Sequence, residues 1–304
     1  MPGPGTDIRA WQGRVRDIEA MGYGAASISD HLIGGWSMDP WVRMTAAVLA
    51  TSQLRVVTLV LANDYRHPAF VHRAIAELDL ISNGRVELGL GTGWWRDEYA
   101  ALGITLDPPA VRVERLAEAI AVVKALFAEG PVERAGTHFQ VRGLVGAPPA
   151  TQRPWPPILV GGGAPAMLEL AGREADIAGI FPPRGPDGLV RPEALEPDRM
   201  AERVAKIVAA AGGAGRPPGT PRLQLSLLAW ELDTREGRSV GHSSVGGELA
   251  TLGRTRDLVG VLVGDIDDAC ARLEAWRTDH GISEIHVGAD ARAFAPIVER
   301  LGGR

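Results

Sequence analysis

The segment SISDHLIGGW, residues 27–36, places an aspartate and a histidine directly after a short apolar run. In a parallel α/β protein, catalytic groups gather on the loops after the strands, so Asp30 and His31 are candidates for a general acid or base. Asp30 could orient His31 or shift its pKa. The alternative is that Asp30 begins a turn and His31 is a hydrogen-bonded polar residue. The pair alone favours this alternative, because such pairs are common.

The segment GRVELGLGTGWWRDEYAALGI, residues 84–104, combines glycines at alternate positions with two adjacent tryptophans. At the end of a strand, Gly89, Gly91 and Gly93 would let the backbone approach a planar ligand closely. Trp94 and Trp95 could then stack on that ligand as a wall. The alternative is a tight packing motif in which the tryptophans fill the core. The residues alone leave both interpretations open.

The run LVLANDYRHP, residues 59–68, changes from apolar to polar residues at Asn63 and ends in a proline. It follows a stretch that is apolar almost throughout, as a strand buried on both faces should be. For Asp64 and Arg66 taken singly, the favoured interpretation is a turn that caps the helix begun by Pro68.

The run LVGGGAPAML, residues 159–168, places Gly161, Gly162 and Gly163 before a helix with Pro165 in its first turn. Free N–H groups at such a helix start bind anions, and phosphate is the natural occupant. A flexible turn is the alternative, but the strand–glycine–helix order favours phosphate although the Walker lysine is absent. The sequence has no zinc or calcium spacing and no Gly-x-Ser-x-Gly motif. A phosphate-bearing ligand with a large flat ring, such as a flavin-like cofactor, remains.

Strands and helices alternate along the chain, which predicts a parallel sheet with crossover helices. A closed (β/α)8 barrel needs eight strands, and a doubly wound open sheet is the alternative. The first βαβ unit lacks the Gly-x-Gly-x-x-Gly turn expected of a dinucleotide site. We predict helices over residues 7–22, 68–81, 111–127, 165–173, 199–211 and 293–301, with others beginning at Asp39 and Asp265. We predict seven strands, over residues 23–30, 54–62, 85–91, 156–163, 175–181, 222–230 and 282–288.

The bulk composition excludes several classes of function. The 304 residues carry a formal net charge of −5 without a basic block, so a nucleic-acid partner is disfavoured. The single cysteine, Cys270, excludes an intramolecular disulfide and a multi-cysteine metal site. The sequence has no membrane-length apolar run and does not begin like a signal peptide, so we expect no membrane partner and a cytoplasmic protein.

Four stretches of the sequence together resemble the luciferase-like monooxygenase superfamily, in particular its actinobacterial branch of coenzyme F420-dependent oxidoreductases. They are SDHL, residues 58–85, residues 84–104 and ILVGGGAPAMLELAGREADIAGI. Residues 262–301 also fit, so the resemblance covers about residues 6–302. The glycine-tryptophan stretch is specific for the superfamily.

The resemblance implies a single TIM-type barrel domain over residues 1–304, with an insertion at about 129–156 that could hold a small hairpin, and a homodimer. It places a deazaflavin or flavin ring across the barrel mouth, beside Asp30 and His31, where His31 can act in proton transfer. It implies a bulge, often with a non-proline cis peptide, under the ring. Glu98 matches an acidic family position that is more structural than catalytic. The implied cofactor-binding residues are Thr58, Leu59, Val60, Asn63, Gly91, the glycines 161–163, and a turn at Ala178 and Gly179.

Two departures from the family pattern matter. Relatives that oxidise sugar phosphates carry a glutamate after Gly-Thr-Gly, where this chain has Trp94, so we do not expect that activity. Relatives also begin with a strand of the type RFGVQ, whereas this chain starts at Met1 within the next segment. We therefore expect the first barrel strand to be missing, with unpaired sheet edges. An upstream start is the favoured explanation, and an open barrel completed by a partner is the alternative.

The expected function is an F420-dependent oxidoreductase that moves a hydride between the deazaflavin C5 and an organic substrate. The alternatives are an FMN-dependent luciferase-like monooxygenase, a non-catalytic cofactor-binding barrel and a barrel without a cofactor. The pocket for the substrate would be lined by Trp36, Trp94, Trp95 and the loops at about 182–197 and 237–250, which favours an apolar or aromatic small molecule.

Overall fold

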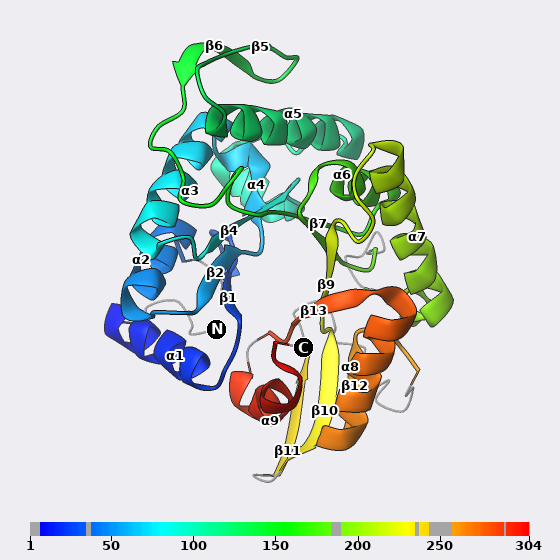
Figure 1. Cartoon of the computed structure of the whole chain (residues 1–304). Coiled ribbons are helices and arrows are strands. Elements are labelled where there is room, and N and C mark those ends of the chain that lie inside the picture. The colour runs from blue at the N-terminus through cyan, green and yellow to red at the C-terminus, as the bar shows by residue number, and fades with distance from the viewer. Residues whose placement is uncertain are drawn as a thin grey trace. The chain divides into compact units, whose positions relative to one another are not determined.

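The computed structural model describes residues 7–34, 38–183, 190–234, 237–242, 257–288 and 290–303 (Figure 1). The chain forms two compact units. The first consists of Met1–Ala20 and Gly24–Gly161, and the second of Met21–Tyr23 and Gly162–Arg304. No described helix is long and apolar enough to cross a membrane.

A parallel sheet forms the centre of the first unit. Its strands run in the order β1 (Ala25–Ile28), β2 (Arg55–Thr58), β4 (Val86–Gly91) and β7 (Ile158–Gly162), and the short β3 (Leu61–Ala62) also pairs with β4. All six residues of β4 are buried, as expected for a parallel strand covered on both faces. The sheet brings the ends of β1, β3 and β4, with their loops, to one edge.

Local capping signals fix where the helices of this unit begin. In α2 (Pro40–Ala50), the Asp39 side chain accepts from the N–H of Val42, with proline in the first turn. α3 (Pro68–Ser82) ends at Asn83, which adopts the left-handed conformation that asparagine tolerates. The remaining helices are α1 (Ile8–Ala20), α4 (Arg96–Leu102) and α5 (Pro109–Phe127).

A β-hairpin projects from the first unit beyond α5 (Figure 1). Its strands are β5 (Pro131–Ala135) and β6 (Gln140–Val145). Glu118 of α5 anchors the hairpin loop, because its carboxylate accepts from the N–H groups of Thr137, His138 and Phe139. The hairpin expected in the insertion at about 129–156 is therefore present.

The second unit contains two small sheets. One is parallel, in the order β8 (Ile177–Ile180), β9 (Arg222–Ser226) and β13 (Ile282–His286). The other has β10 (Ala229–Thr234) between β11 (Gly237–His242) and β12 (Val261–Asp265). The helical elements of this unit are α6 (Pro165–Glu174), η3 (Pro192–Leu195), α7 (Pro197–Gly213), α8 (Ile266–His280) and α9 (Ala291–Leu301).

The seven predicted strands are present as β1, β2, β4, β7, β8, β9 and β13, and the first element among the described residues is a helix, α1. The prediction was wrong in three places. The run 54–62 forms two strands, β2 and β3. The run 222–230 ends as β9 and continues into β10 of the other sheet. Residues 237–242, expected to belong to a loop at about 237–250, form β11, whereas residues 243–250 lie outside the described residues.

Candidate functional site

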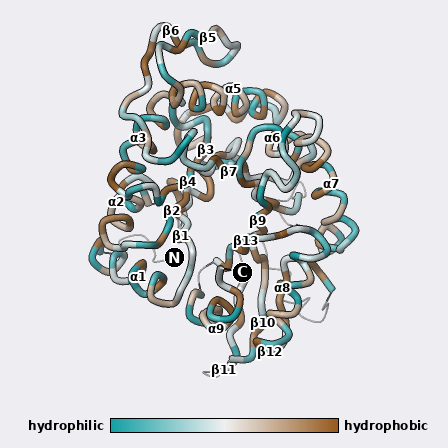
Figure 2. Tube along the Cα trace, in the orientation of Figure 1, coloured by the Kyte–Doolittle hydropathy of each residue, from teal (hydrophilic) through white to brown (hydrophobic). Residues whose placement is uncertain are grey.

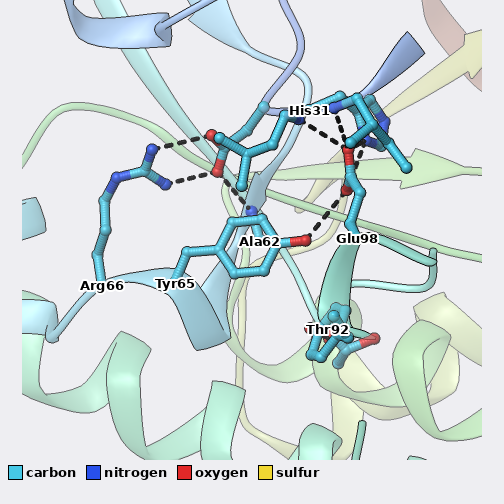
Figure 3. Close-up of polar contacts among 10 residues, drawn as sticks. His31, Ala62, Tyr65, Arg66, Thr92 and Glu98 are labelled. Carbon is cyan, nitrogen blue, oxygen red and sulfur yellow. Dashed lines mark hydrogen bonds and ion pairs between the residues drawn. The ribbon is translucent and has the colours of Figure 1, made fainter. Parts of the chain in front are cut away.

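Glu98 is the centre of a hydrogen-bonded network in the first unit (Figure 3). It lies in the first turn of α4, and its carboxylate is buried. The Nδ1 atom of His31 lies 3.1 Å from both carboxylate oxygens. Oε1 also accepts from the backbone N–H groups of Leu32, at 2.8 Å, and Ile33, at 3.3 Å. Oε2 accepts from the Tyr65 hydroxyl at 3.0 Å, so one carboxylate holds His31, the loop after it and Tyr65.

The surroundings of Glu98 favour its ionised form. Burial acts to raise its pKa, but the hydrogen bonds from His31 and from two backbone N–H groups outweigh burial and lower the pKa below its usual value. An ionised carboxylate only accepts hydrogen bonds, so His31 donates from Nδ1. Nε2 is then the ring nitrogen that can take up or release a proton. Burial, together with the Glu98 charge, raises the pKa of Tyr65 and keeps its hydroxyl protonated as a donor.

Trp94 and Trp95 lie against the imidazole of His31. Their rings stack on each other at 5.5 Å with an interplanar angle of 9°. The His31 ring contacts both edge-on, at 5.9 Å from Trp94 and 5.4 Å from Trp95. Trp94 is 47% exposed, so it does not fill the core. The pair forms an apolar surface beside the histidine. Trp36, the third expected pocket residue, lies outside the described residues.

Asp30 is also buried, but its partner is an arginine (Figure 3). Arg66 binds it with two hydrogen bonds, at 2.5 Å to Oδ2 and 2.9 Å to Oδ1. Oδ2 also accepts from the N–H of Ala62 at 3.1 Å. A paired arginine and carboxylate make a rigid, charge-assisted contact. Asp30 therefore joins the end of β1 to β3 and the segment after it, and it is Glu98 that contacts the His31 ring.

The Thr58-Leu59-Val60 segment forms the expected bulge between β2 and β3. The peptide bond between Leu59 and Val60 is cis, as the resemblance implied. The Thr58 hydroxyl donates to the carbonyl of Gly89 at 2.9 Å and accepts from its N–H at 2.8 Å. The bulge is thereby attached to β4.

The alternate glycines make room for protein neighbours. A Cβ at Gly89 would overlap the carbonyl oxygen of Thr58, and one at Gly91 would lie 2.7 Å from a methyl of Val60. A Cβ at Gly93 would overlap the Tyr99 hydroxyl. We interpreted these glycines as keeping space for a planar ligand. The structure corrects that reason: the space that they leave holds the bulge and Tyr99.

Asn63 brings an unpaired donor to this region. It follows β3, is 7% exposed, and its Nδ2 has no hydrogen-bond partner. An unpaired buried amide is costly unless a ligand or water satisfies it. Asn63 and Tyr65 also line a cavity of about 460 Å³ in the first unit. Arg115, Ile104 and Phe139 lie on its wall.

Two arginines of α5 support the loops of this site. Arg112 donates to the carbonyl oxygens of Thr92 and Gly93, which lie just before the tryptophan pair. Arg115 pairs with Asp64, 2.9 Å away, and with Asp107. The three-residue spacing places both guanidinium groups on one side of α5. They hold the glycine-tryptophan loop and the segment after β3.

A glycine turn lies at the start of the second unit. Gly161 and Gly162 end β7, and Gly163 leads into the first turn of α6. The three glycines are half-buried and residues 164–166 are exposed, but Pro165 has no N–H and the Met167 N–H donates to the carbonyl of Ala164. Ala178 and Gly179, expected to form a turn, lie within β8 opposite Leu223 and Gln224 of β9, because the run is a buried strand. That prediction of a turn was wrong.

One group could hold a cation by the type of its side chains. Ligand atoms of Glu114, Glu118 and His138 lie within 4.8 Å of one another. Glu118, however, already accepts from three backbone N–H groups of the hairpin loop. The group is accounted for by its contact between α5 and the hairpin.

Comparison with known families shows which family the chain belongs to. The model of the family described as luciferase-like monooxygenase matches residues 1–237. The chain belongs to the luciferase-like monooxygenase family. An uncharacterised protein of Mycobacterium tuberculosis is 33% identical over 239 residues, covering 78% of this chain and 74% of that protein. The F420-dependent glucose-6-phosphate dehydrogenase of Microbacterium testaceum is 32% identical over 188 residues, covering 59% of this chain and 54% of that enzyme.

Solved structures show the same fold. The coenzyme F420-dependent tetrahydromethanopterin reductase from Methanopyrus kandleri has a TM-score of 0.77 at 17% identity, over 98% of this chain and 95% of that chain. A riboflavin lyase with modified FMN and riboflavin has a TM-score of 0.75 at 14% identity, over 97% and 85%. The chain therefore has the α/β barrel-type fold of luciferase-like proteins.

Sequence reasoning missed several residues of this site. Glu98 was expected to be structural, and its contact with His31 was not foreseen, because the two are 67 residues apart. Tyr65, Arg66, Arg112 and Arg115 were not recognised as contributors. The one available signal was the spacing of Arg112 and Arg115, which places them on the same side of a helix.

Proposed function

We propose that the protein is an F420-dependent oxidoreductase that transfers a hydride between the deazaflavin C5 and an apolar organic substrate. The observation that carries this proposal is His31, held at Nδ1 by Glu98 with the stacked tryptophans beside its ring. A histidine fixed in this way is suited to move one proton at Nε2. The F420-dependent relative supports the choice of cofactor.

The described residues fit a ring-bearing cofactor with a phosphate. In the first unit, Asn63 has an unpaired buried Nδ2 that would donate to a polar ring edge, and the backbone of residues 58–60 would support the ring. The backbone of Gly91 and Gly161 would also contact the ring. In the second unit, the backbone N–H groups of Gly162, Gly163 and the exposed Ala164 and Ala166 would be offered to a phosphate. Residues 178–179 would contact the cofactor only through their backbone atoms, because they lie within β8.

The reaction divides between cofactor and protein. When bound, the deazaflavin supplies a carbon that accepts or gives a hydride. His31 would take the hydroxyl proton of an alcohol at Nε2, or return a proton in the reverse direction. Glu98 stabilises the charged imidazolium and fixes the ring, and Tyr65 with two backbone N–H groups fixes Glu98. Asp30 acts indirectly, because its ion pair with Arg66 holds the segment that follows β3.

The tryptophan pair would select the substrate. Trp94 and Trp95 present aromatic surface beside His31 and carry no charge that would bind the phosphate of a phosphorylated sugar. An apolar or aromatic substrate would gain from stacking and from displacing water. We propose an apolar or aromatic small molecule as the substrate. We also propose a cytoplasmic location, which cell fractionation would test.

Titration of the purified protein with F420 and with FMN, followed by fluorescence, tests the cofactor. We expect saturable F420 binding and weaker FMN binding. Tight FMN binding without F420 binding would overturn the choice in favour of an FMN-dependent monooxygenase, the second candidate, which the family description supports.

Turnover separates an enzyme from a non-catalytic cofactor-binding barrel. The protein loaded with F420 is assayed against alcohols, imines and enones that differ in apolar surface. We expect turnover with at least one aromatic or apolar member and loss of that turnover in His31→Ala. Cofactor binding without turnover across the whole set would contradict the proposed activity.

A further inference from the structure

Among the described residues, neither His31 nor the tryptophan pair lines the cavity of about 460 Å³ in the first unit. Its walls come from residues 63–67, which are η2 (Asn63–Tyr65) and the two residues after it, from the segment 104–107, from Arg115 of α5 and from residues 138–139 of the hairpin loop. The hairpin lies next to α5, as Figures 1 and 2 show, and Glu118 bonds the hairpin loop to that helix. Sites for small molecules have volumes of about 300–1,000 Å³, so this cavity is large enough for a ligand.

The charged side chains in the wall of the cavity already have partners. Arg66 binds Asp30 with two hydrogen bonds. Arg115 pairs with both Asp64 and Asp107. A charged ligand would compete with these partly buried pairs, and breaking such a pair is costly. An uncharged ligand leaves all of them intact.

Two buried nitrogen atoms of the wall have no hydrogen-bond partner among the described residues. They are Nδ2 of Asn63, which is 7% exposed, and Nε2 of His138. A carboxylate oxygen of Glu114 lies 3.7 Å from this Nε2, which is beyond hydrogen-bond distance. Buried polar atoms are costly unless a ligand or water satisfies them. The Asn63 amide has two N–H groups, so one can serve the cavity while the other remains for the ring edge named in the proposed function.

His67 and Phe139 give the same wall aromatic surface. Nδ1 of His67 accepts from the N–H of Ala69 at 3.2 Å, so the His67 ring carries its proton on Nε2 and is a further donor. The His67 and Phe139 rings meet edge-on, with their centroids 5.3 Å apart. Ile104 adds an aliphatic side chain. The wall therefore combines N–H donors with apolar surface that suits another ring.

We propose that this cavity binds a small uncharged molecule that carries a carbonyl group on an aromatic ring. The carbonyl oxygen has two lone pairs and accepts from Asn63 and His138. The ring packs against His67 and Phe139, and the ligand enters past the exposed Thr105. The inference does not rest on the proposed function, because the first unit alone supplies every wall of the cavity.

Methyl NMR of the full chain without cofactor, with labelled isoleucines and acetophenone as the probe, tests the site. The Ile104 methyl signal, assigned by its loss in Ile104→Val, should shift saturably as acetophenone is added. The signal of Ile207, in α7 of the second unit, should not shift. Benzoate and benzylamine resemble the probe in size but carry a charge, so each should bind at least about 10-fold more weakly. An Ile104 signal that does not move, or equal affinity for either charged compound, would overturn the proposal.

A pair of histidine variants tests the carbonyl contact. His138→Phe keeps a ring but removes the nitrogen donor, so acetophenone should bind about 5-fold more weakly. His280 also has a ring nitrogen without a hydrogen-bond partner among the described residues, but it lies in α8 of the second unit. His280→Phe should therefore leave the affinity unchanged. Equal affinities of the two variants would overturn the contact with His138.

A pair of threonine variants tests the location. Thr105→Trp fills the exposed entrance and should weaken acetophenone binding by at least about 10-fold. Thr278→Trp, at an exposed position of α8, should not change it. Circular dichroism confirms that all variants are folded. Unchanged affinity in Thr105→Trp, or loss of binding in Trp94→Ala, would place the ligand elsewhere and overturn the proposed site.

Discussion

The Glu98 network and the glycine turn before α6 are two opposite ways to build a binding region. The first depends on side chains: one buried carboxylate accepts from His31, Tyr65 and two backbone N–H groups. The second depends on backbone: Gly162 and Gly163 leave little space for a Cβ, and residues 164–166 after them are exposed. The difference teaches that the first region should be sensitive to the chemistry of a substitution and the second to its volume.

Removal of the central carboxylate should have the largest effect. Glu98→Ala leaves His31 and several N–H and O–H donors without their acceptor, and we expect a loss of about 3–5 kcal/mol in the free energy of unfolding. Urea denaturation measures this loss. Asp97→Ala, an exposed neighbour on the same turn, should change stability by less than about 0.5 kcal/mol. Equal effects of the two variants would show that the network does not depend on the buried carboxylate.

His31→Ala should damage turnover more than folding. The loss of the group that moves the proton should lower kcat by about 10²–10⁴-fold. Cofactor affinity, read from fluorescence, should stay within a few-fold of the wild type, because the proposed phosphate contacts come from the second unit. A variant with unchanged kcat would remove His31 from the proposed mechanism.

Added volume should matter most at the glycine turn. A Cβ at Gly163 would overlap the carbonyl oxygen of Phe181, so Gly163→Ala should cost about 1–3 kcal/mol of stability and weaken cofactor binding. The control is Gly212→Ala in α7, where no atom lies within 4 Å of the added Cβ. That control should stabilise the helix by about 0.5–1 kcal/mol. Two variants with the same thermal midpoint would contradict the role of volume.

The smallest effect concerns pH. The pKa of Glu98 is lowered in the folded protein, so the stability from its ionised form is present above the usual value of 4.5 and is lost as pH falls through the lowered pKa. The difference in unfolding free energy between the wild type and Glu98→Gln should therefore stay nearly constant above about pH 5 and shrink as pH falls below 4.5. Urea titrations of both proteins at several pH values measure it. A difference that grows on acidification would contradict the ionised state of Glu98.

Local patterns predicted the elements but not the contacts between them. Asp39 with Pro40, and the apolar run that became β4, predicted a helix and a strand because capping and burial act over a few residues. The partner of His31 could not be predicted, because Glu98 reaches it only after the sheet places β1 and β4 in order. The chemistry of His31 was visible in the sequence, whereas the carboxylate that orients it was not.

The resemblance supplied what periodicity could not. It placed a cis peptide within residues 58–60, which no local propensity indicates, and the structure has it between Leu59 and Val60. It also led us to a turn at residues 178–179, although the run around them is apolar enough for a strand, and there the local pattern was the better guide.

The contact between Thr58–Val60 and Gly89–Gly91 has a consequence for how related sequences can diverge. The Thr58 carbonyl and a Val60 methyl occupy the space where side chains of residues 89 and 91 would stand. The bulge cannot be rebuilt alone, nor can either glycine be exchanged alone. Across descendants of this sequence, the two segments should therefore change together or remain unchanged, as a single inherited unit. Trp94, three residues after Gly91, is exposed and can change with the substrate.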